Sequence, residues 1–374
     1  MEVKEIKEGK TKLLVPDFTG IPEHGPAFYN PKMSVNRSRS SFIIRALFDK
    51  ARIADILTGI GARAVRYANE GNDFEVYAND IQPSAIKLCE KNAELNDVKV
   101  ETSIMEANQF LIQNKYDKFD FIDIDPFGSP ANFLNSAMQA IKPTGGVLGI
   151  TATDTGTLAG IYPKACFRKY YTVSERTSFA HELGIRNLIA SVFREAAKYE
   201  YSIEPLYSYN HIHYNRTFIK IQGGRKTTNR DLKNIGYAKY CKKCERRELI
   251  PAFDDYELKC ECGEQAKVLG LTWIGKIAKP DFLDLLYKKR TDGMKMHEPE
   301  AAYIEKGNSE YEIEMPYYNI SSLTKIHKKE SQKLSKIIEE LKSNGYKAHS
   351  THFEGQAIKT NAPYSQLINA VFKK

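Results

Sequence analysis

Five short apolar runs alternate with amphipathic stretches between about residue 53 and residue 154 of this 374-residue chain. The runs are ADIL, FEVYAND, VKVETSI, FDFIDID and GVLGITATD. Short apolar runs are typical of strands buried on both faces, and amphipathic stretches between them are typical of crossover helices. The alternation therefore predicts βαβ units and an α/β fold with a parallel sheet.

Two strand-like arms follow a helical run from Ser178 to Tyr199, with a turn expected near Asn215. A hairpin at the end of an otherwise parallel sheet resembles the class I methyltransferase fold. We therefore expect a Rossmann-like sheet that ends in an antiparallel hairpin.

Composition is that of a folded globular protein, with 42% apolar and 27% charged residues. The N-terminal residues lack the apolar core of a signal peptide, and no run approaches the ~18 apolar residues of a membrane span. We expect a cytoplasmic protein that does not interact with membranes, and we infer no obligate protein partner. The net charge of +8 favours a polyanionic partner, although a basic housekeeping enzyme also fits it.

The first βα turn carries a Gly-x-Gly loop, formed by Gly59 and Gly61, ahead of a helical stretch. Glycines let the backbone pass close to a bound cofactor, and Asp80, at the end of the next strand, stands where a ribose acceptor is expected. Glu106 and Ala107 suit an adenine edge, but Glu106 is equally suited to a helix start. These features predict an adenosine cofactor without separating a methyl donor from a dinucleotide.

The fourth apolar run ends in Asp125-Pro126-Phe127-Gly-Ser, which is also good turn chemistry. Ligands of open α/β sheets sit at the carboxyl ends of the strands, so Asp125 is expected in a cleft. Methyltransferases that act on exocyclic amines of bases carry such an acid, proline and aromatic residue here. Asp125 and the Pro126 carbonyl can accept hydrogens from the amine, and Phe127 can stack on a base, a contact worth ~1–3 kcal/mol.

Longer motifs along the chain are similar to those of tRNA guanosine-26 N2,N2-dimethyltransferases of the archaeal type, and the resemblance covers nearly the whole chain. The motifs are EGKTKLLVPD, AFYNPKMSVNRSRS, LTGIGARAVRYANE, AND, FIDIDPFGSP, GITATDTGTLAG and THFEGQAIKTNAP. The resemblance implies an enzyme that transfers methyl groups from S-adenosylmethionine to N2 of a guanosine in tRNA, twice.

The resemblance also implies roles for single residues. Arg37 is expected to contact the carboxylate of S-adenosylmethionine, and Arg63 to face the cofactor, although Arg66 is an alternative. Phe28 and Phe127 are expected to clamp the flipped guanine between two faces. Arg37 could instead be an ordinary surface charge, and Phe28 could be a core residue.

The same resemblance implies that Asp80 binds the ribose of the cofactor and that Glu106 and Ala107 contact its adenine. It also implies that Asp125 is the catalytic acceptor. For Asp80, Glu106 and Asp125 these roles agree with the chemistry expected from their positions in the strand pattern.

Four cysteines form two pairs that are separated by fifteen residues: Cys241, Cys244, Cys260 and Cys262. Two such pairs predict a structural zinc site, because four thiolates fill a tetrahedral shell. The second pair is one residue tighter than the usual spacing. We expect a zinc knuckle over residues 237–268, whereas Cys89 and Cys166 are expected to be buried thiols.

The polar stretch Gly224–Asp231 (GRKTTNRD) suits a linker. It divides the chain into a methyltransferase domain, residues 1–230, and a smaller α+β C-terminal domain, residues 231–374. Apolar residues at helical spacing and many lysines between 321 and 343 resemble a winged-helix-like module, for which we expect contact with tRNA.

Three other functions remain open from the residues alone. An Asp-Pro-aromatic motif suits any exocyclic amine, so the substrate could be adenine N6 or a different guanosine. A nicotinamide oxidoreductase and a non-catalytic zinc-ribbon protein that binds nucleic acid are more distant possibilities.

Overall fold

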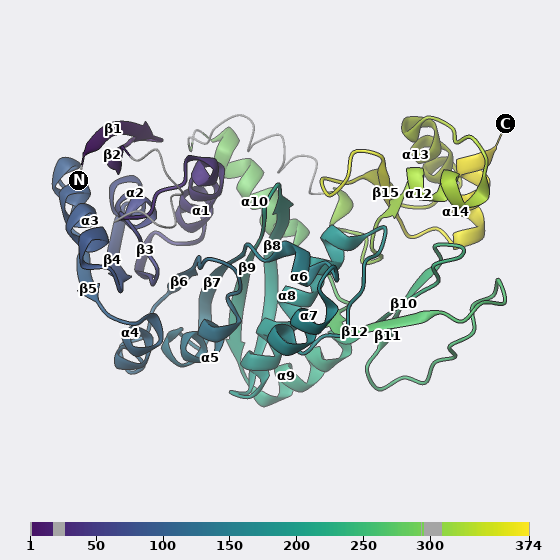
Figure 1. Cartoon of the computed structure of the whole chain (residues 1–374), viewed down its shortest axis with the longest axis horizontal. Coiled ribbons are helices and arrows are strands. Elements are labelled where there is room, and N and C mark those ends of the chain that lie inside the picture. Colours follow the sequence, from purple (N-terminus) through teal and green to yellow (C-terminus); the bar gives the residue numbers. More distant parts are fainter. Residues whose placement is uncertain (1, 18–26, 293, 295–308, 374) are drawn as a thin grey trace.

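A seven-stranded mixed sheet forms the centre of the protein, whose computed structural model describes residues 2–17, 27–292, 294 and 309–373 (Figure 1). Its first five strands are parallel, and the last two form the expected antiparallel hairpin. The order across the sheet is β5 (Glu101–Ile104), β4 (Asp73–Asp80), β3 (Lys50–Asp55), β6 (Phe121–Ile124), β7 (Thr144–Ala152), β9 (Tyr214–Gly223) and β8 (Tyr201–His211). The prediction of an α/β fold with this sheet is confirmed, and the hairpin turns two residues earlier than expected.

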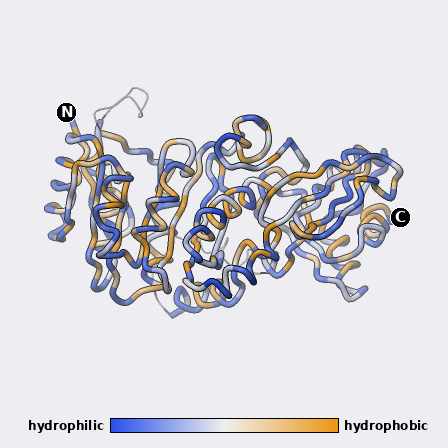
Figure 2. Tube along the Cα trace, turned by 90° about the horizontal axis from the view of Figure 1, so that it is seen from below, coloured by the Kyte–Doolittle hydropathy of each residue, from blue (hydrophilic) through white to orange (hydrophobic). Residues whose placement is uncertain are grey.

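Helices connect the strands, and all of them bury residues against the rest of the domain. They are α1 (Ser34–Leu47), α2 (Ala62–Glu70), α3 (Pro83–Leu95), α4 (Ala107–Gln113), α5 (Ala131–Ala140), α6 (Thr155–Leu158), α7 (Pro163–Tyr170) and α8 (Ala180–Ala197). Hydrophobic and hydrophilic residues alternate along much of the trace (Figure 2). None of the helices among the described residues is long and apolar enough to span a bilayer.

A two-stranded hairpin precedes the sheet domain's first helix and packs on α2 and α3. Its strands are β1 (Val3–Glu8) and β2 (Thr11–Pro16), and the 3-10 helix η2 (Pro31–Met33) leads into α1. Asn92 of α3 accepts from the backbone N–H of Leu14 and donates to its carbonyl, at 2.6 and 3.2 Å. This hairpin brings Glu8 to the base of α1, next to the candidate site.

The stretch expected to be a linker is a helix, α9 (Arg225–Asp231), followed by the 3-10 turn η3 (Leu232–Asn234). The hydroxyls of Thr227 and Thr228 donate to the carbonyl of Gly224, at 2.7 and 2.9 Å. The segment is therefore helical and not the turn-rich stretch expected, and it contains no proline that would interrupt a helix. Its role as a linker between two domains stays a prediction.

Among its described residues, the C-terminal part forms two small sheets and the four helices named below. The first sheet has the order β11 (Arg247–Pro251), β10 (Ile235–Tyr240) and β12 (Lys267–Trp273), and α10 (Pro280–Thr291) follows it. The second has the order β13 (Tyr318–Asn319), β15 (Ala357–Thr360) and β14 (Ala348–Ser350), and packs against α12 (Ile320–His327), α13 (Leu334–Ser343) and α14 (Tyr364–Phe372).

The main hydrophobic core continues past residue 230. Ile235, Leu269 and Trp273 of the first small sheet belong to it, whereas most buried apolar residues between 318 and 371 form a separate core. The domain boundary at 230 stays a prediction. Residues 318–371 have a core of their own, whereas the residues between 231 and 317 share the core of the sheet domain.

A buried ion network fixes the C-terminal sheet to α8. Lys359 of β15 and Arg186 both contact Oε1 of Glu182, at 2.9 and 2.7 Å, and all three side chains are fully buried. Arg186 also donates to the carbonyls of Trp273 and Gly275, each at 3.0 Å. These contacts join the sheet domain to both small sheets.

Candidate active site

The loop from Asp125 to Pro130 leaves the carboxyl end of β6 and turns toward α5. Asp125 is partly exposed, Pro126 is buried, and the Phe127 side chain is 60% exposed. Thr153, at the end of β7, anchors the loop: its hydroxyl accepts from the N–H of Gly128 at 2.6 Å, and its N–H donates to the Gly128 carbonyl at 2.9 Å. The acid and the aromatic ring therefore stand on a fixed loop at the edge of the sheet where ligands bind.

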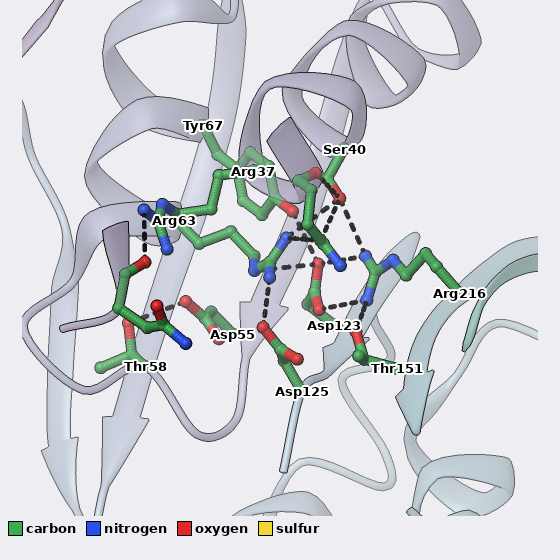
Figure 3. A network of polar contacts seen from close by, with 12 residues as sticks. Arg37, Ser40, Asp55, Thr58, Arg63, Tyr67, Asp123, Asp125, Thr151 and Arg216 are labelled. Atoms are coloured by element: carbon green, nitrogen blue, oxygen red, sulfur yellow. Dashed lines mark hydrogen bonds and ion pairs between the residues drawn. The ribbon is translucent and has the colours of Figure 1, made fainter. Parts of the chain in front are cut away.

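Arg63 of α2 lies between two carboxylates of β6 and the loop that follows it (Figure 3). Its Nη2 donates to Oδ2 of Asp125, while its Nε lies 3.6 Å from Oδ2 of Asp123. Nη1 donates to Asn36 and Ser40 of α1, at 2.9 and 3.0 Å. Arg63 is buried, so its direction is set by four partners from three segments.

Asp123 is the fully buried centre of this network, and the sequence analysis did not select it. Arg216 of β9 donates to both of its carboxylate oxygens, at 2.9 and 2.8 Å, and Tyr67 donates to Oδ2 at 2.6 Å. Burial by itself would raise the pKa of Asp123, but Arg216 and Arg63 more than offset this effect and hold the pKa below its usual value. The Asp123 carboxylate therefore stays charged, and its ion pair helps to hold the Arg63 guanidinium in place.

Asp55, at the end of β3, is a buried carboxyl close to Arg63 and Asp123. Its Oδ2 accepts from the hydroxyl of Thr58 at 2.8 Å. Burial and the neighbouring Asp123 raise the pKa of Asp55 to about 7, against the lowering effect of Arg63. This carboxyl can therefore exchange a proton near neutral pH, directly beneath the glycine loop.

The glycine loop has the positive φ angles that its sequence predicts, 56° at Gly59 and 75° at Gly61. A Cβ at Gly61 would overlap Cys89 of α3, so this glycine is required for packing as well as for the turn. Asp80 accepts from the N–H of Gly59 through Oδ2 and from the N–H of Gln82 through Oδ1, each at 2.9 Å. The loop and the end of β4 are thus one rigid unit.

Glu106 caps α4, which was the alternative considered for it. Its Oε2 accepts from the N–H of Gln109 and its Oε1 from the amide of Asn108, both at 3.0 Å. Ala107 beside it is buried. Each oxygen of an ionised carboxylate can accept more than one hydrogen bond, so the cap does not exclude contact with a ligand.

Arg37 and Arg66 lie in a second cluster around Glu8. Nε of Arg37 donates to Glu8 at 2.8 Å, and Nη2 donates to the Asn30 carbonyl at 3.1 Å. Arg66 contacts Glu8 at 3.3 Å and Glu70 at 2.8 Å. Arg37 is therefore a buried residue and not a surface charge, and of the two arginines of α2 only Arg63 is bonded to Asp125.

Phe28 and Phe127 meet, but not as the two parallel walls that a clamp requires. Their ring centroids lie 4.4 Å apart and their planes are 82° apart, an edge-to-face contact. A base stacked between two faces needs about twice the usual stacking separation, so a clamp requires one ring to turn. Phe28 is half-buried beside the loop and is not a core residue.

The four cysteines expected to bind metal come together at one end of the first small sheet. Their sulfur atoms all lie within 4.8 Å of one another. Cys241 and Cys262 are 3.5 Å apart, and Cys244 and Cys260 are 3.6 Å apart. Such a cluster could bind a metal ion. Cys89 and Cys166 are buried elsewhere, where burial raises the pKa of both thiols, as expected for inert core cysteines.

The structure thus brings Asp125, Arg63 and the two phenylalanines together, and places Arg37 in the neighbouring cluster. The sequence analysis missed Asp123, Tyr67 and Arg216. A signal for Asp123 existed, because residues two apart on a strand share a face and a carboxylate in an apolar run needs a cation. Nothing in the sequence identified Arg216, 93 positions later, as that cation.

Comparison with known proteins agrees with this site. The chain matches the model of the N2,N2-dimethylguanosine tRNA methyltransferase family over residues 9–372. It is 35% identical to a Pyrococcus furiosus protein named tRNA (guanine(26)-N(2))-dimethyltransferase, with 100% of this chain and 99% of the relative covered. An Aquifex aeolicus relative, 33% identical over 97% of this chain and 94% of its own, is named for both guanine 26 and guanine 27.

A solved structure of high similarity is Trm1 from Pyrococcus horikoshii in complex with S-adenosyl-L-methionine. It superposes with a TM-score of 0.89 at 31% identity and covers 99% of this chain and all of its own. Because the family model matches almost the full length and relatives above 30% identity cover the chain from end to end, this chain belongs to the N2,N2-dimethylguanosine tRNA methyltransferase family.

Proposed function

We propose that this chain transfers methyl groups from S-adenosylmethionine to the exocyclic N2 of guanosine 26 in tRNA, first to N2-methylguanosine and then to N2,N2-dimethylguanosine. The observation that carries the proposal is the hydrogen bonding of the two Asp125 carboxylate oxygens. Arg63 binds Oδ2, while Oδ1 accepts no hydrogen bond from any residue in the described ranges. One oxygen is therefore held in place and the other is left for a substrate.

The acceptor is needed because an aryl amine is a weak nucleophile. The N2 lone pair is delocalised into the guanine ring, and it becomes available as the nitrogen turns pyramidal. An acceptor that binds an N2 hydrogen favours this change, and Asp125 with the Pro126 carbonyl can supply two acceptors. Arg63 and Asp123 keep the Asp125 carboxylate oriented toward the substrate, and Phe127 offers an exposed face for stacking.

The residues of the glycine loop fit the methyl donor. Asp80 has one hydrogen bond on each oxygen and retains the capacity to bind ribose hydroxyls, and Glu106 retains the same capacity toward adenine. When bound, S-adenosylmethionine supplies a methyl group activated by its sulfonium. The protein's part is to align donor and amine, for which we propose Gly59, Gly61, Arg37, Arg63 and Ala107 as further contacts.

Nucleoside mass spectrometry tests the function directly. An unmodified tRNA transcript incubated with the protein and S-adenosylmethionine should yield N2-methylguanosine and then N2,N2-dimethylguanosine, and a transcript with adenosine at position 26 should yield neither. A transcript in which only guanosine 27 can react tests whether this chain also has the wider specificity for which the Aquifex relative is named. Methylation of that transcript would show it. N6-methyladenosine as the product would favour the alternative substrate and contradict the proposal.

The aromatic pair should matter most for the second methylation. A monomethylated amine has one remaining hydrogen and one productive orientation, so it depends more on a firmly held base. We therefore expect Phe127→Ala to accumulate N2-methylguanosine at the expense of the dimethylated product in a time course. Phe253→Ala, which removes a ring that is 80% exposed in the C-terminal part, is the matched control and should leave the product ratio unchanged. If Phe127→Ala lowered the amounts of both methylated products equally, Phe127 would contribute only to binding of the tRNA.

We also propose that the four cysteines hold a structural zinc ion. Tetrahedral thiolates at the usual ~2.3 Å from zinc lie about 3.8 Å from each other, close to the two sulfur pairs described above. All four ligands come from the protein, which leaves no open position for chemistry. We assign the chemistry to residues 1–230 and tRNA contact to residues 231–374, with the zinc knuckle at 237–268, and we expect the protein to act in the cytoplasm, where it meets its substrate.

Cys241→Ser should release the metal and loosen the small sheet around β10, because metal binding there contributes folding free energy. Binding of S-adenosylmethionine should persist, since the cofactor loop has its own core. Metal analysis and limited proteolysis measure the two effects, with Cys166→Ala as the control that keeps its zinc. The assignment would be contradicted if metal analysis found no zinc in the purified wild-type protein.

A further inference from the structure

A cavity of about 380 Å3 lies between α5, α7 and α8, outside the site described above. The first turn of α5 contributes Ala131 and Asn132, the last turn of α7 contributes Arg168 and Lys169, and α8 contributes Arg194 and Glu195. Three of these six side chains are cationic, and one is anionic.

Two of the charged groups in the cavity are already neutralised. Lys169 lies 3.1 Å from Asp154, and Glu195 lies 2.7 Å from Lys198. By contrast, neither Arg168 nor Arg194 has an ion-pair partner within residues 2–17, 27–292, 294 and 309–373. The cavity therefore carries an excess positive charge that no ion pair with a described residue balances.

Among the described residues, the acceptors to which Arg194 donates hydrogen bonds are all neutral. Nη1 donates to the carbonyl of Leu271 at 3.2 Å, and Nη2 donates to the carbonyl of Tyr170 and lies 3.4 Å from the hydroxyl of Thr172. Burial lowers the pKa of its guanidinium to about 10, so the group is still charged at neutral pH. A charge that is partly removed from water without a counter-ion is costly, and a bound anion would offset that cost.

The cavity is joined to the candidate active site by short contacts. Ala131 follows Phe127 by four residues, so their Cα atoms are at most ~15 Å apart. On the other wall, Tyr170 of α7 donates to Asp154 at 2.6 Å, and Asp154 directly follows Thr153, which anchors the Gly128 backbone. An anion in the cavity would thus lie close to a base stacked on Phe127.

Large apolar side chains around α7 are unusually exposed. Their exposed fractions range from 52% to 69%, and the residues are Ile161, Tyr162, Phe167, Tyr171 and Val173. Tyr171 also lines the cavity. Exposed aromatic rings beside arginines are the combination that binds single-stranded or unstacked RNA, through base stacking and phosphate contacts.

We propose that this cavity binds a backbone phosphate of the tRNA close to the target guanosine, with Arg168 and Arg194 as its ligands. The inference rests on the proposed function, because it takes tRNA as the substrate. Arginine suits this role because its planar guanidinium can bind two phosphate oxygens at once. A phosphate contact at this place positions the strand while Asp125 and Phe127 engage the base.

Reversal of one exposed charge tests the proposal. Arg168→Glu changes the net charge by two without disturbing a buried contact, and Lys87→Glu on α3, at the other end of the sheet, is the matched control (Figure 1). We expect Arg168→Glu to raise the Kd for tRNA about tenfold at low salt and to reduce the slope of log K against log salt concentration by about one, relative to the control. The Kd for S-adenosylmethionine should not change.

Phosphate ethylation interference then locates the contact. A single ethylated phosphate near guanosine 26 should weaken binding to the wild type and have little further effect on Arg168→Glu. The proposal would be overturned if Arg168→Glu and Lys87→Glu had the same effect on the Kd for tRNA. It would also be overturned if Arg168→Glu left the Kd for tRNA unchanged, because the cavity would then bind at most a free anion. Wild-type protein that binds tRNA but methylates no guanosine would contradict the proposed function instead.

Discussion

Asp125→Asn should lower kcat for tRNA methylation by about 10²–10⁴-fold, the range lost when a positioned proton acceptor is removed. The substitution keeps the shape of the side chain, but it replaces a carboxylate oxygen with an amide N–H group that repels either Arg63 or the N2 hydrogens. Because the acceptor acts mainly in the transition state, the Kd for S-adenosylmethionine should stay within about twofold of the wild type.

Single-turnover methylation and equilibrium dialysis with S-adenosylmethionine measure these two quantities. Asp117→Asn is the matched control: its side chain is 79% exposed and is paired with Arg52, away from the loop. It should leave both values unchanged. Near-normal turnover of Asp125→Asn would remove Asp125 from the mechanism, whatever the effect on tRNA binding.

Arg216→Met should destabilise the protein by about 3–5 kcal/mol, the cost of leaving a buried charge without its partner. Arg216 and Asp123 are both fully buried, and two hydrogen bonds connect them. Lys142→Met removes an ion pair with Asp120 that is partly exposed, and should cost no more than about 1 kcal/mol. Urea unfolding of the two variants gives the comparison.

The pH dependence of this loss has a definite sign. In the wild type, the pKa of Asp123 is held below its usual value, so the stability it contributes is lost only when the pH falls below about 4. Without Arg216, burial dominates and raises that pKa, so a proton bound by the folded state stabilises it. The deficit of Arg216→Met should therefore be smaller at pH 5 than at pH 7.

A second substitution checks the cause. If the loss comes from an unpaired carboxylate, Asp123→Asn in the Arg216→Met background should recover part of the stability, whereas the effects should add if the two residues act independently. A loss below about 1 kcal/mol for Arg216→Met would mean that Tyr67 and Arg63 are sufficient partners for Asp123.

Much of the fold could be predicted because its signals are local. The apolar runs and the helices between them are read from residues within a few positions of each other, and the hairpin after Tyr199 follows from two strand-like arms. The same holds for the turn at Asp125 and for the cysteine pairs, whose spacing reflects the short reach of a metal knuckle. The segment Gly224–Asp231 is helical and not turn-rich as expected, because polar composition does not distinguish a short exposed helix from a loop.

The candidate site shows where local signals end. Asp125 and Phe127 were found because they lie on one strand end, but the direction of the Asp125 carboxylate depends on Arg63, from another segment. The choice between Arg63 and Arg66 could not be made from the sequence, since both lie on the same short helix. In the structure, Arg66 is taken up by Glu8 and Glu70, and Arg63 is bonded to Asp125.

The sequence by itself determined the class of sheet, the loop that bears Asp125, and the cysteines that could hold a metal, because each depends on neighbours along the chain. Only the tertiary structure decided which charges meet: Asp123 with Arg216, Arg37 with Glu8, and Lys359 with Glu182. These partners are 29 to 177 positions apart. A buried charge needs a partner, but any of many cations in the chain could supply it until the strands and helices are packed.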